Sequence, residues 1–553
     1  MTDQPTPHGT RPPLARRGAD LERLANEPWD LLIVGGGIVG AGALLDSVSR
    51  GLRVALVEQD DIAVGTSSRS SRLIHGGLRY LQQFEVNLVR EALRERARLL
   101  RLAPHLVRLE NFLFPLYGPR VATRALYTAG LTLYDLLGSA KSGGRHQQLS
   151  VDETLEYAPD LIRKHLRGAL LYHDAMEDDA RFTLAVVRTA VAQETGVAIA
   201  LTRVRAIGPI RHGDRVMGAT VEDRLTGATF DVRASAVLDA TGVWGAMPDR
   251  PFGAGSFNVL PSRGSHLVIP RERIRARGGM TLRIPGRVAF MVPWPRHWII
   301  GTTDHPFHGE VDRVAASGAE VDEILGTLNG ALDTRITRDD LVGTYAGLRP
   351  LIAPTDASST VKVSREHKVS VEGEGLVRVS GGKYTTYRVM ARDAVNAILG
   401  SEAKTRPSGT ADLPIIGAAA RSGLDALVTR LTLEAGIGDA AARSLVDRHG
   451  TEAEEVLALG RSHDLVRPLV DGHPFLEAEI AWAAEHELAL SLDDLLARRT
   501  RLAPVLRDRG ESIAPRVAAI AGHVLGWDAA RQAAEVAAYL EGAHREYDVP
   551  PPD

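Results

Sequence analysis

The sequence predicts a mixed α/β protein that begins with a Rossmann-like βαβ unit and ends with a separate helical domain. Residues 30–58 read as strand, Gly-rich turn, helix and strand. Strand-like apolar runs and helices then alternate to about residue 399, and residues 418–544 are rich in Ala, Leu, Glu and Arg at helical spacing. A chain of 553 residues exceeds the roughly 250–300 residues that one core can hold, so we expect more than one domain.

The elements are predicted in order along the chain. Residues 31–34, LLIV, are continuously apolar, as in a buried parallel strand. A helix over residues 38–49 and a second strand over 53–58 complete the βαβ unit, and a long charged helix over 85–101 is ended by Pro104. Further strands are expected at residues 197–201, 236–238, 266–269, 288–292 and 298–300.

Composition shifts predict the domain boundaries. Residues 1–28 are rich in Pro, Arg and Asp and are expected to form a disordered arm. Residues 29–399 would hold a discontinuous two-part domain, 400–412 a polar linker, 413–546 the helical domain and 547–553 a tail.

Bulk composition excludes several classes of function. The net charge of −3 provides no basic field for nucleic acid, and the absence of cysteine excludes disulfides, thiolate catalysis and Cys-based metal sites. Neither a signal peptide nor an apolar run of the roughly 18 residues that a span needs is evident. We therefore expect a cytoplasmic protein with at most a peripheral contact with the inner face of the cell membrane. A homo-oligomer is compatible with the sequence.

The strongest local motif lies at residues 35–40, where GGGIVG matches G-x-G-x-x-G. In this pattern Gly35 permits the tight turn, Gly37 lets the backbone approach a pyrophosphate, and Gly40 lets the helix pack on the strand. Glu58 ends the second strand about 20 residues further on, where an acid accepts hydrogen bonds from ribose hydroxyls. Because strand, turn, helix, strand and acid all fall in order, the segment predicts a dinucleotide site.

The residues after this unit favour FAD over NAD. Residues 65–71, GTSSRSS, offer hydroxyl and N–H groups to a second phosphate or a ribityl chain, and Ala-Thr-Gly follows a strand at 240–242. With these features the chain resembles the flavoprotein superfamily of D-amino-acid oxidase, in which such a turn returns near the FAD. The predicted fold is therefore α/β (α+β overall), with a Rossmann-like FAD-binding domain, an interleaved β-rich substrate domain and a C-terminal α-helical domain. Motif and resemblance together imply non-covalent FAD held by Gly35, Gly36, Gly37, Ile38, Gly40, Glu58, Gln59, Thr66, Ser67, Ser68, Ser70, His75, Gly76, Gly77, Val204, Thr241, Gly242, Gly382 and Thr385.

The segment LIHGGLRYL at residues 73–81 is the most specific one. It resembles the signature of the FAD-dependent, quinone-linked glycerol-3-phosphate dehydrogenases, and GSH, IGTTD, GLRPL, GGKYTTY and DDLLARRTR follow in that family's order at residues 264–266, 300–304, 347–351, 381–387 and 493–501. The resemblance covers about residues 30–535. It implies oxidation of sn-glycerol 3-phosphate to dihydroxyacetone phosphate by hydride transfer to flavin N5, with electrons passed to a membrane quinone.

The candidate catalytic residues also suit this chemistry when the family resemblance is set aside. A phosphomonoester carries close to two negative charges, and Arg79, Arg349 and Lys383 are cations in Gly-flanked loops that could meet it. An imidazole such as His266 can remove the hydroxyl proton of a secondary alcohol. Each of these side chains alone could equally be structural. Two further candidates for hydrogen bonds to the substrate are Tyr80 and Thr302.

Two further features of the sequence have a structural interpretation beside the functional one. His75 could face the isoalloxazine or serve only the fold. The acidic run at residues 172–179 superficially resembles a metal site, but such runs are more often solvated loops or helix N-termini, so no metal is expected.

Three rival functions fit the sequence less well. A glycerol-3-phosphate oxidase, with O₂ as acceptor, would carry an insertion of tens of residues before the C-terminal domain, and none stands between Gly382 and Asp412. An amine or amino-acid oxidase would need a carboxylate clamp instead of the three cations. A non-catalytic flavin-bound regulatory module would not need an intact substrate signature. The dehydrogenase is therefore favoured.

Overall fold

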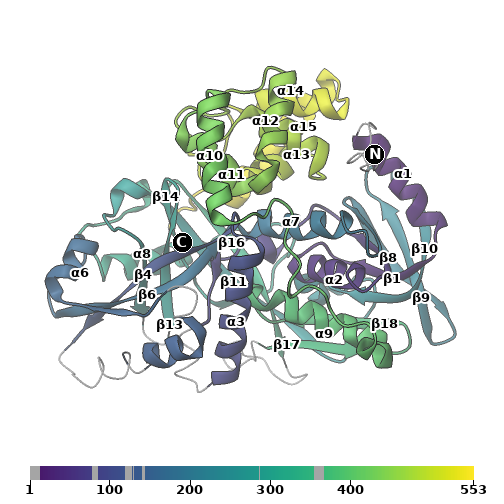
Figure 1. Cartoon of the computed structure of the whole chain (residues 1–553), viewed down its shortest axis with the longest axis horizontal. Coiled ribbons are helices and arrows are strands. Elements are labelled where there is room, and N and C mark those ends of the chain that lie inside the picture. Colours follow the sequence, from purple (N-terminus) through teal and green to yellow (C-terminus); the bar gives the residue numbers. More distant parts are fainter. Residues whose placement is uncertain are drawn as a thin grey trace.

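The computed structural model describes residues 13–77, 85–118, 128, 130–139, 144–284, 287–353 and 366–553. Within them the chain forms a two-sheet body, on which a lobe of helices sits (Figure 1).

The first sheet contains the predicted βαβ unit. Strand β1 (Trp29–Val34) pairs in parallel with β2 (Arg53–Val57) and β10 (Thr229–Asp239), so its Leu, Ile and Val side chains are buried on both faces. The strand order is β17-β18-β10-β1-β2-β7, and an antiparallel β8-β9 hairpin extends from β10. The remaining strands are β7 (Val197–Leu201), β8 (Val204–His212), β9 (Arg215–Asp223), β17 (His367–Val371) and β18 (Leu376–Gly381).

Helices cover this first sheet. On one face α2 (Ile38–Val48) packs between α7 (Asp179–Val191) and α9 (Tyr387–Leu399), and α3 (Val86–Leu102) adds Leu99 to the same core. The expectation of disorder in residues 1–28 was wrong for α1 (Pro13–Asn26). That helix buries Leu24 in the core on the other face of the sheet, and Arg17 pairs with Asp223 at 2.7 Å. Burial of one apolar stripe stabilises a helix whose composition alone suggests a coil.

The second sheet, largely antiparallel, is the predicted β-rich part. Its strand order is β15-β11-β14-β13-β12-β4-β6-β3, with β16 paired to β11 and β5 to β6. Its helices are α6 (Val151–Tyr157) and α8 (Gly318–Asn329). The strands are β3 (Leu73–Ile74), β4 (Val107–Tyr117), β5 (Gln147–Leu149), β6 (Leu166–Glu177), β11 (Asn258–Pro270), β12 (Gly279–Ile284), β13 (Arg287–Trp294), β14 (His297–Gly301), β15 (His305–Pro306) and β16 (Gly343–Ala353).

The C-terminal lobe is helical, as predicted, and shares one hydrophobic core with β4, β6 and α3 of the body. In Figure 1 it is the green-to-yellow lobe above the two sheets. The expected linker packs against the body, since Ser408 Oγ donates to Asp46 of α2. The expected tail packs too, because Asp553 accepts the Ala319 N–H at 2.9 Å. The helices are α10 (Arg421–Ala435), α11 (Asp439–His449), α12 (Ala453–Ser462), α13 (Glu477–His486), the π-helical turn η10 (Asp494–Arg499), α14 (Ala514–Leu525) and α15 (Ala529–Tyr547).

Candidate active site

A cavity of about 580 Å³ lies where the two sheets meet. Four strands of the first sheet open into it at their carboxyl ends, where β1 leads to Gly35, β2 to Glu58, β10 to Ala240 and β18 to Lys383. The carboxyl edge of a parallel sheet is the usual position of a ligand site in α/β folds. The second sheet closes the cavity with β11 and β16.

Most of the predicted site residues line this one cavity. They are Gly35, Gly37, Ile38, Glu58, Gln59, Thr66, Ser67, Ser70, His75, Val204, Thr241, Gly242, His266, Arg349, Gly382, Lys383 and Thr385. Six others are not among the residues that line it, namely Gly36, Gly40, Ser68, Gly76, Gly77 and Thr302. Arg79 and Tyr80 lie outside the described residues.

The Gly-rich turn has the conformation that its sequence requires. Gly35 has φ of +114°, and a Cβ there would lie 2.6 Å from the Ala240 carbonyl oxygen. A Cβ on Gly40 would lie 1.9 Å from the Gly35 oxygen. Both positions therefore need glycine, and the turn directs the N-terminus of α2 at the cavity.

Glu58 is buried beside this turn. Its carboxylate accepts the Gly36 N–H at 2.6 Å and the Asp60 N–H at 2.9 Å. Burial outweighs these two hydrogen bonds and raises the pKa of Glu58 to about 7. A carboxylate with spare lone pairs at a cavity wall is suited to accept ribose hydroxyls.

The hydroxyl-rich loop after β2 folds over the same turn. Ser67 Oγ accepts the Ile38 N–H at 2.9 Å, and Thr66 Oγ1 donates to the Leu348 carbonyl at 2.5 Å. Ser68 is buried behind the wall, where its Oγ donates to the Gly65 carbonyl at 3.4 Å. A helix N-terminus, a hydroxyl loop and a buried acid around one elongated cavity fit a dinucleotide such as FAD.

His266 projects from β11 into the substrate side of the cavity. Its ring stacks on Tyr345 of β16, with centroids 4.6 Å apart, and its Nε2 lies 2.8 Å from Ser71 Oγ. Burial, and then the charges of Arg349 and Arg72, hold the pKa of His266 well below its ordinary value. At neutral pH the imidazole is therefore uncharged and able to accept a proton.

Arg349 lies on β16, opposite Ser262 of β11. Its guanidinium donates to Thr302 Oγ1 at 3.0 Å and to the Thr303 carbonyl at 3.2 Å, and it pairs with Asp304 at 3.2 Å. Thr302 thus helps to position Arg349. Because the side chain is about a quarter exposed and lines the cavity, it can also meet an anion.

The loop of the most specific motif is tied to the GGKYTTY segment. The His75 N–H donates to Thr385 Oγ1 at 3.2 Å, and the His75 ring contacts Phe290 with centroids 5.9 Å apart. Behind the wall the Gly76 N–H donates to Tyr134 Oη at 2.9 Å, and Gly77 has φ of +77°. The two motifs therefore form one wall of the cavity.

Tyr345 and Trp244 are among the wall and contact residues that were not predicted, and Ser71 was predicted only as part of the hydroxyl segment 65–71. Ser71 and Tyr345 hold the His266 ring, and Trp244 covers Gly65 of the hydroxyl loop. Tyr345 could have been found from strand alternation, because residues two and four apart on a strand share a face and Arg349 is four residues on.

The acidic run at 172–179 lies in β6 and α7, where Asp174 pairs with Arg96 at 2.5 Å. In the described part of the chain no three His, Asp or Glu side chains are grouped to hold a metal ion.

Comparison with known proteins agrees with this geometry. Residues 30–388 match the FAD dependent oxidoreductase family, and residues 408–532 match the C-terminal domain of alpha-glycerophosphate oxidase. The fold and the cavity thus define an FAD-dependent oxidoreductase. Glycerol-3-phosphate dehydrogenase 2 of Mycobacterium tuberculosis is 44% identical over 536 residues, which is 96% of this chain and 91% of that protein. The human mitochondrial glycerol-3-phosphate dehydrogenase is 35% identical, over 93% of this chain and 73% of its own. The chain therefore belongs to the family of FAD-dependent glycerol-3-phosphate dehydrogenases.

Solved structures share the same architecture. A Bacillus halodurans glycerol-3-phosphate dehydrogenase complexed with FAD superposes with a TM-score of 0.78 at 26% identity, over 96% of this chain and 97% of that one. An L-alpha-glycerophosphate oxidase from Mycoplasma pneumoniae shares the fold with a TM-score of 0.53, at 17% identity over 67% of this chain and 95% of its own.

Proposed function

We propose that this enzyme oxidises sn-glycerol 3-phosphate to dihydroxyacetone phosphate and passes the electrons to a quinone. The observation that carries the proposal is that one cavity joins a dinucleotide cradle to a substrate end lined by His266, Arg349 and Lys383. FAD, when bound, supplies the acceptor for the hydride that leaves C2 of the substrate.

The cations bind the phosphate in this proposal. Arg349 and Lys383 line the same cavity, and two charge-assisted contacts suit a phosphomonoester that carries almost two negative charges. Arg79, which lies outside the described residues, would add a third cation.

His266 accepts the hydroxyl proton in this proposal. The ring is neutral because burial and the Arg349 charge lower its pKa. A bound phosphate dianion would offset the Arg349 charge and make the imidazole a stronger base once substrate is present. Ser71 and Tyr345 hold the ring in one orientation while the alcohol loses its proton and becomes a carbonyl.

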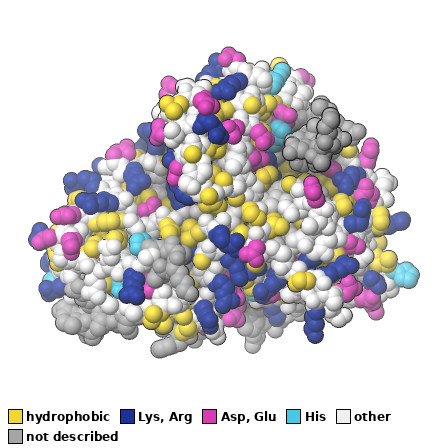
Figure 2. Space-filling model, in the orientation of Figure 1, with side chains coloured by type: hydrophobic (Ala, Val, Ile, Leu, Met, Phe, Trp, Pro, Cys, Tyr) yellow, Lys and Arg dark blue, Asp and Glu magenta, His cyan; other side chains and the backbone are white. Residues whose placement is uncertain are grey.

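The acceptor belongs to the proposal as well. The absence of an insertion between Gly382 and Asp412 favours a quinone over O₂. No helix among the described residues has the length and apolarity to cross a bilayer, so a quinone would be met at the surface of a membrane. Lys and Arg side chains gather over α3 on the face shown in Figure 2. Within this helix Arg90, Arg94 and Arg101 are exposed. Such a patch favours anionic lipid.

Steady-state kinetics test the substrate and the acceptor together. With a soluble quinone analogue we expect turnover of sn-glycerol 3-phosphate at a kcat/KM far above that of glycerol, and much slower turnover with O₂ alone. Equal rates with O₂ and the analogue would indicate an oxidase. A better rate with an amino acid than with sn-glycerol 3-phosphate would overturn the proposed substrate.

A further inference from the structure

The helical domain reaches the cofactor region through three buried arginines in and after η10, namely Arg498, Arg499 and Arg501. Each is 3–4% exposed. A guanidinium buried to that degree needs charged partners, and each has a partner in the body, on loops that form the dinucleotide cradle. We infer that these residues, here named the arginine clamp, position the FAD-binding loops, and that cofactor retention is a function of the helical domain.

The first contact of the clamp is with Asp61. Arg499 donates to both carboxylate oxygens of Asp61 at 2.7 Å, and Arg498 donates to Oδ2 at 2.5 Å. Asp61 is fully buried and does not line the cavity. It therefore acts on the cofactor through its neighbours, three residues after Glu58.

Backbone hydrogen bonds carry this contact to the Gly-rich turn. The loop that contains Asp61 donates from Ala63 N–H to the Gly36 carbonyl at 3.0 Å. In the other direction the Gly36 N–H donates to Glu58 at 2.6 Å. Residues 58–63 and the turn at 35–37 thus hydrogen-bond to each other in both directions. The clamp holds this pair of segments through Asp61.

The second contact is with the hydroxyl loop. Arg501 donates to the Ser68 carbonyl at 2.7 Å and to Asp179 Oδ1 at 2.9 Å, while Asp179 Oδ2 accepts the Ser70 N–H at 2.9 Å. Arg501 has φ of +60°, a conformation that costs energy and persists where the surroundings impose it. The same loop is tied once more, because Arg69 pairs with Glu546 of α15.

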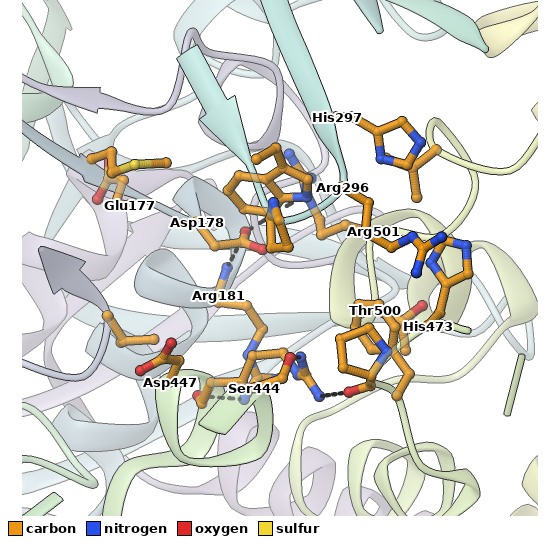
Figure 3. A pocket seen from close by; sticks show the side chains of 18 of the residues that line it. Glu177, Asp178, Arg181, Arg296, His297, Ser444, Asp447, His473, Thr500 and Arg501 are labelled. Carbon is orange, nitrogen blue, oxygen red and sulfur yellow. Dashed lines mark hydrogen bonds and ion pairs between the residues drawn. The ribbon is translucent and has the colours of Figure 1, made fainter. Parts of the chain in front are cut away.

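Other contacts between the lobes supply a control. Figure 3 shows the seam beside the clamp, where Arg181 of α7 and Arg501 lie around a cavity of about 100 Å³. Further along α7, Arg188 makes two 2.7 Å hydrogen bonds to Glu452 of the helical domain. This pair is largely buried, at 14% and 13% exposure, yet its hydrogen bonds reach none of the loops that line the FAD cavity. It therefore joins the domains without holding a cofactor loop.

The test is FAD affinity, which involves no substrate and is therefore independent of the proposed reaction. Apoprotein of Arg499→Met and Arg501→Met is titrated with FAD by flavin fluorescence, beside the control Glu452→Gln. We expect the Kd for FAD to rise at least about tenfold in each clamp variant and to stay within about twofold in the control. The midpoint of thermal unfolding of each apoprotein is measured as well, so that affinity is compared among variants of similar stability.

The conservative variant Arg499→Lys covers the case in which the methionine variants do not fold. Lysine keeps the charge but loses the two-pronged contact with Asp61, so we expect a smaller rise in Kd, of about three- to tenfold. Unchanged FAD affinity in Arg499→Lys, or in either methionine variant that folds, would refute the clamp. So would an equal loss of affinity in Glu452→Gln, because any break between the domains would then suffice.

Discussion

The pH dependence of FAD binding is predicted by the environment of Glu58. The pKa of this buried carboxyl is raised to about 7, chiefly by burial. Ribose hydroxyls that donate to the carboxylate favour its ionised form, so FAD binding should lower that pKa. The affinity for FAD is therefore full above pH 7 and is lost as the pH falls through 7, because protonated Glu58 must first release its proton.

Glu58 has a pKa of about 7 in the apoprotein, and FAD binding lowers it. The affinity for FAD should therefore fall between pH 8 and pH 6, by up to about tenfold. Glu58→Gln keeps the shape of the side chain but removes the charge. It should weaken binding at pH 8 by roughly 10- to 100-fold, the value of a charged hydrogen bond.

The assay is a titration of apoprotein with FAD at half-unit intervals from pH 6 to pH 8. The unmodified protein should show the decline, and Glu58→Gln should be flat over the same range. A flat profile in the unmodified protein, or the same slope in Glu58→Gln, would show that another group titrates and that Glu58 does not bind the ribose.

Two further predictions concern the substrate end. Arg349→Ala should raise the activation free energy that kcat/KM reports for sn-glycerol 3-phosphate by about 2–4 kcal/mol. The corresponding value for glycerol should change far less, because only sn-glycerol 3-phosphate carries the dianion. An equal loss for both substrates would assign Arg349 to the support of Thr302 and the fold. Arg349→Lys should recover only part of the loss, because the fork geometry is gone. Ser71→Ala should lower kcat about tenfold or more with little change in KM or FAD content, because the hydroxyl orients His266; an unchanged kcat would remove Ser71 from the mechanism.

Local sequence predicts the conformation of the Gly-rich turn, for a physical reason. Gly35 has φ of +114°, a Cβ on Gly40 would meet the Gly35 carbonyl oxygen, and Glu58 follows at the end of the next strand. The residues that define a motif of this kind all lie within about 30 positions of one another in the sequence.

Contacts between distant segments could not be predicted in this way. Ser71 meets His266 across 195 residues, and Arg499 meets Asp61 across 438. The sequence allows many contact partners for a serine in a hydroxyl-rich loop or an arginine in a basic run. Only the folded structure shows which partner each of them meets. The same holds for α1, whose Pro- and Arg-rich surroundings suggest a coil while the burial of Leu24 stabilises a helix.

Anaerobic reduction of the FAD-loaded protein tests the central claim most directly. Mixing with sn-glycerol 3-phosphate should bleach the visible flavin absorbance in a single turnover and yield one dihydroxyacetone phosphate per FAD, whereas glycerol and free amino acids at the same concentration should leave the spectrum unchanged. A flavin that stays oxidised with sn-glycerol 3-phosphate, or that is bleached faster by an amino acid, would contradict the proposed reaction.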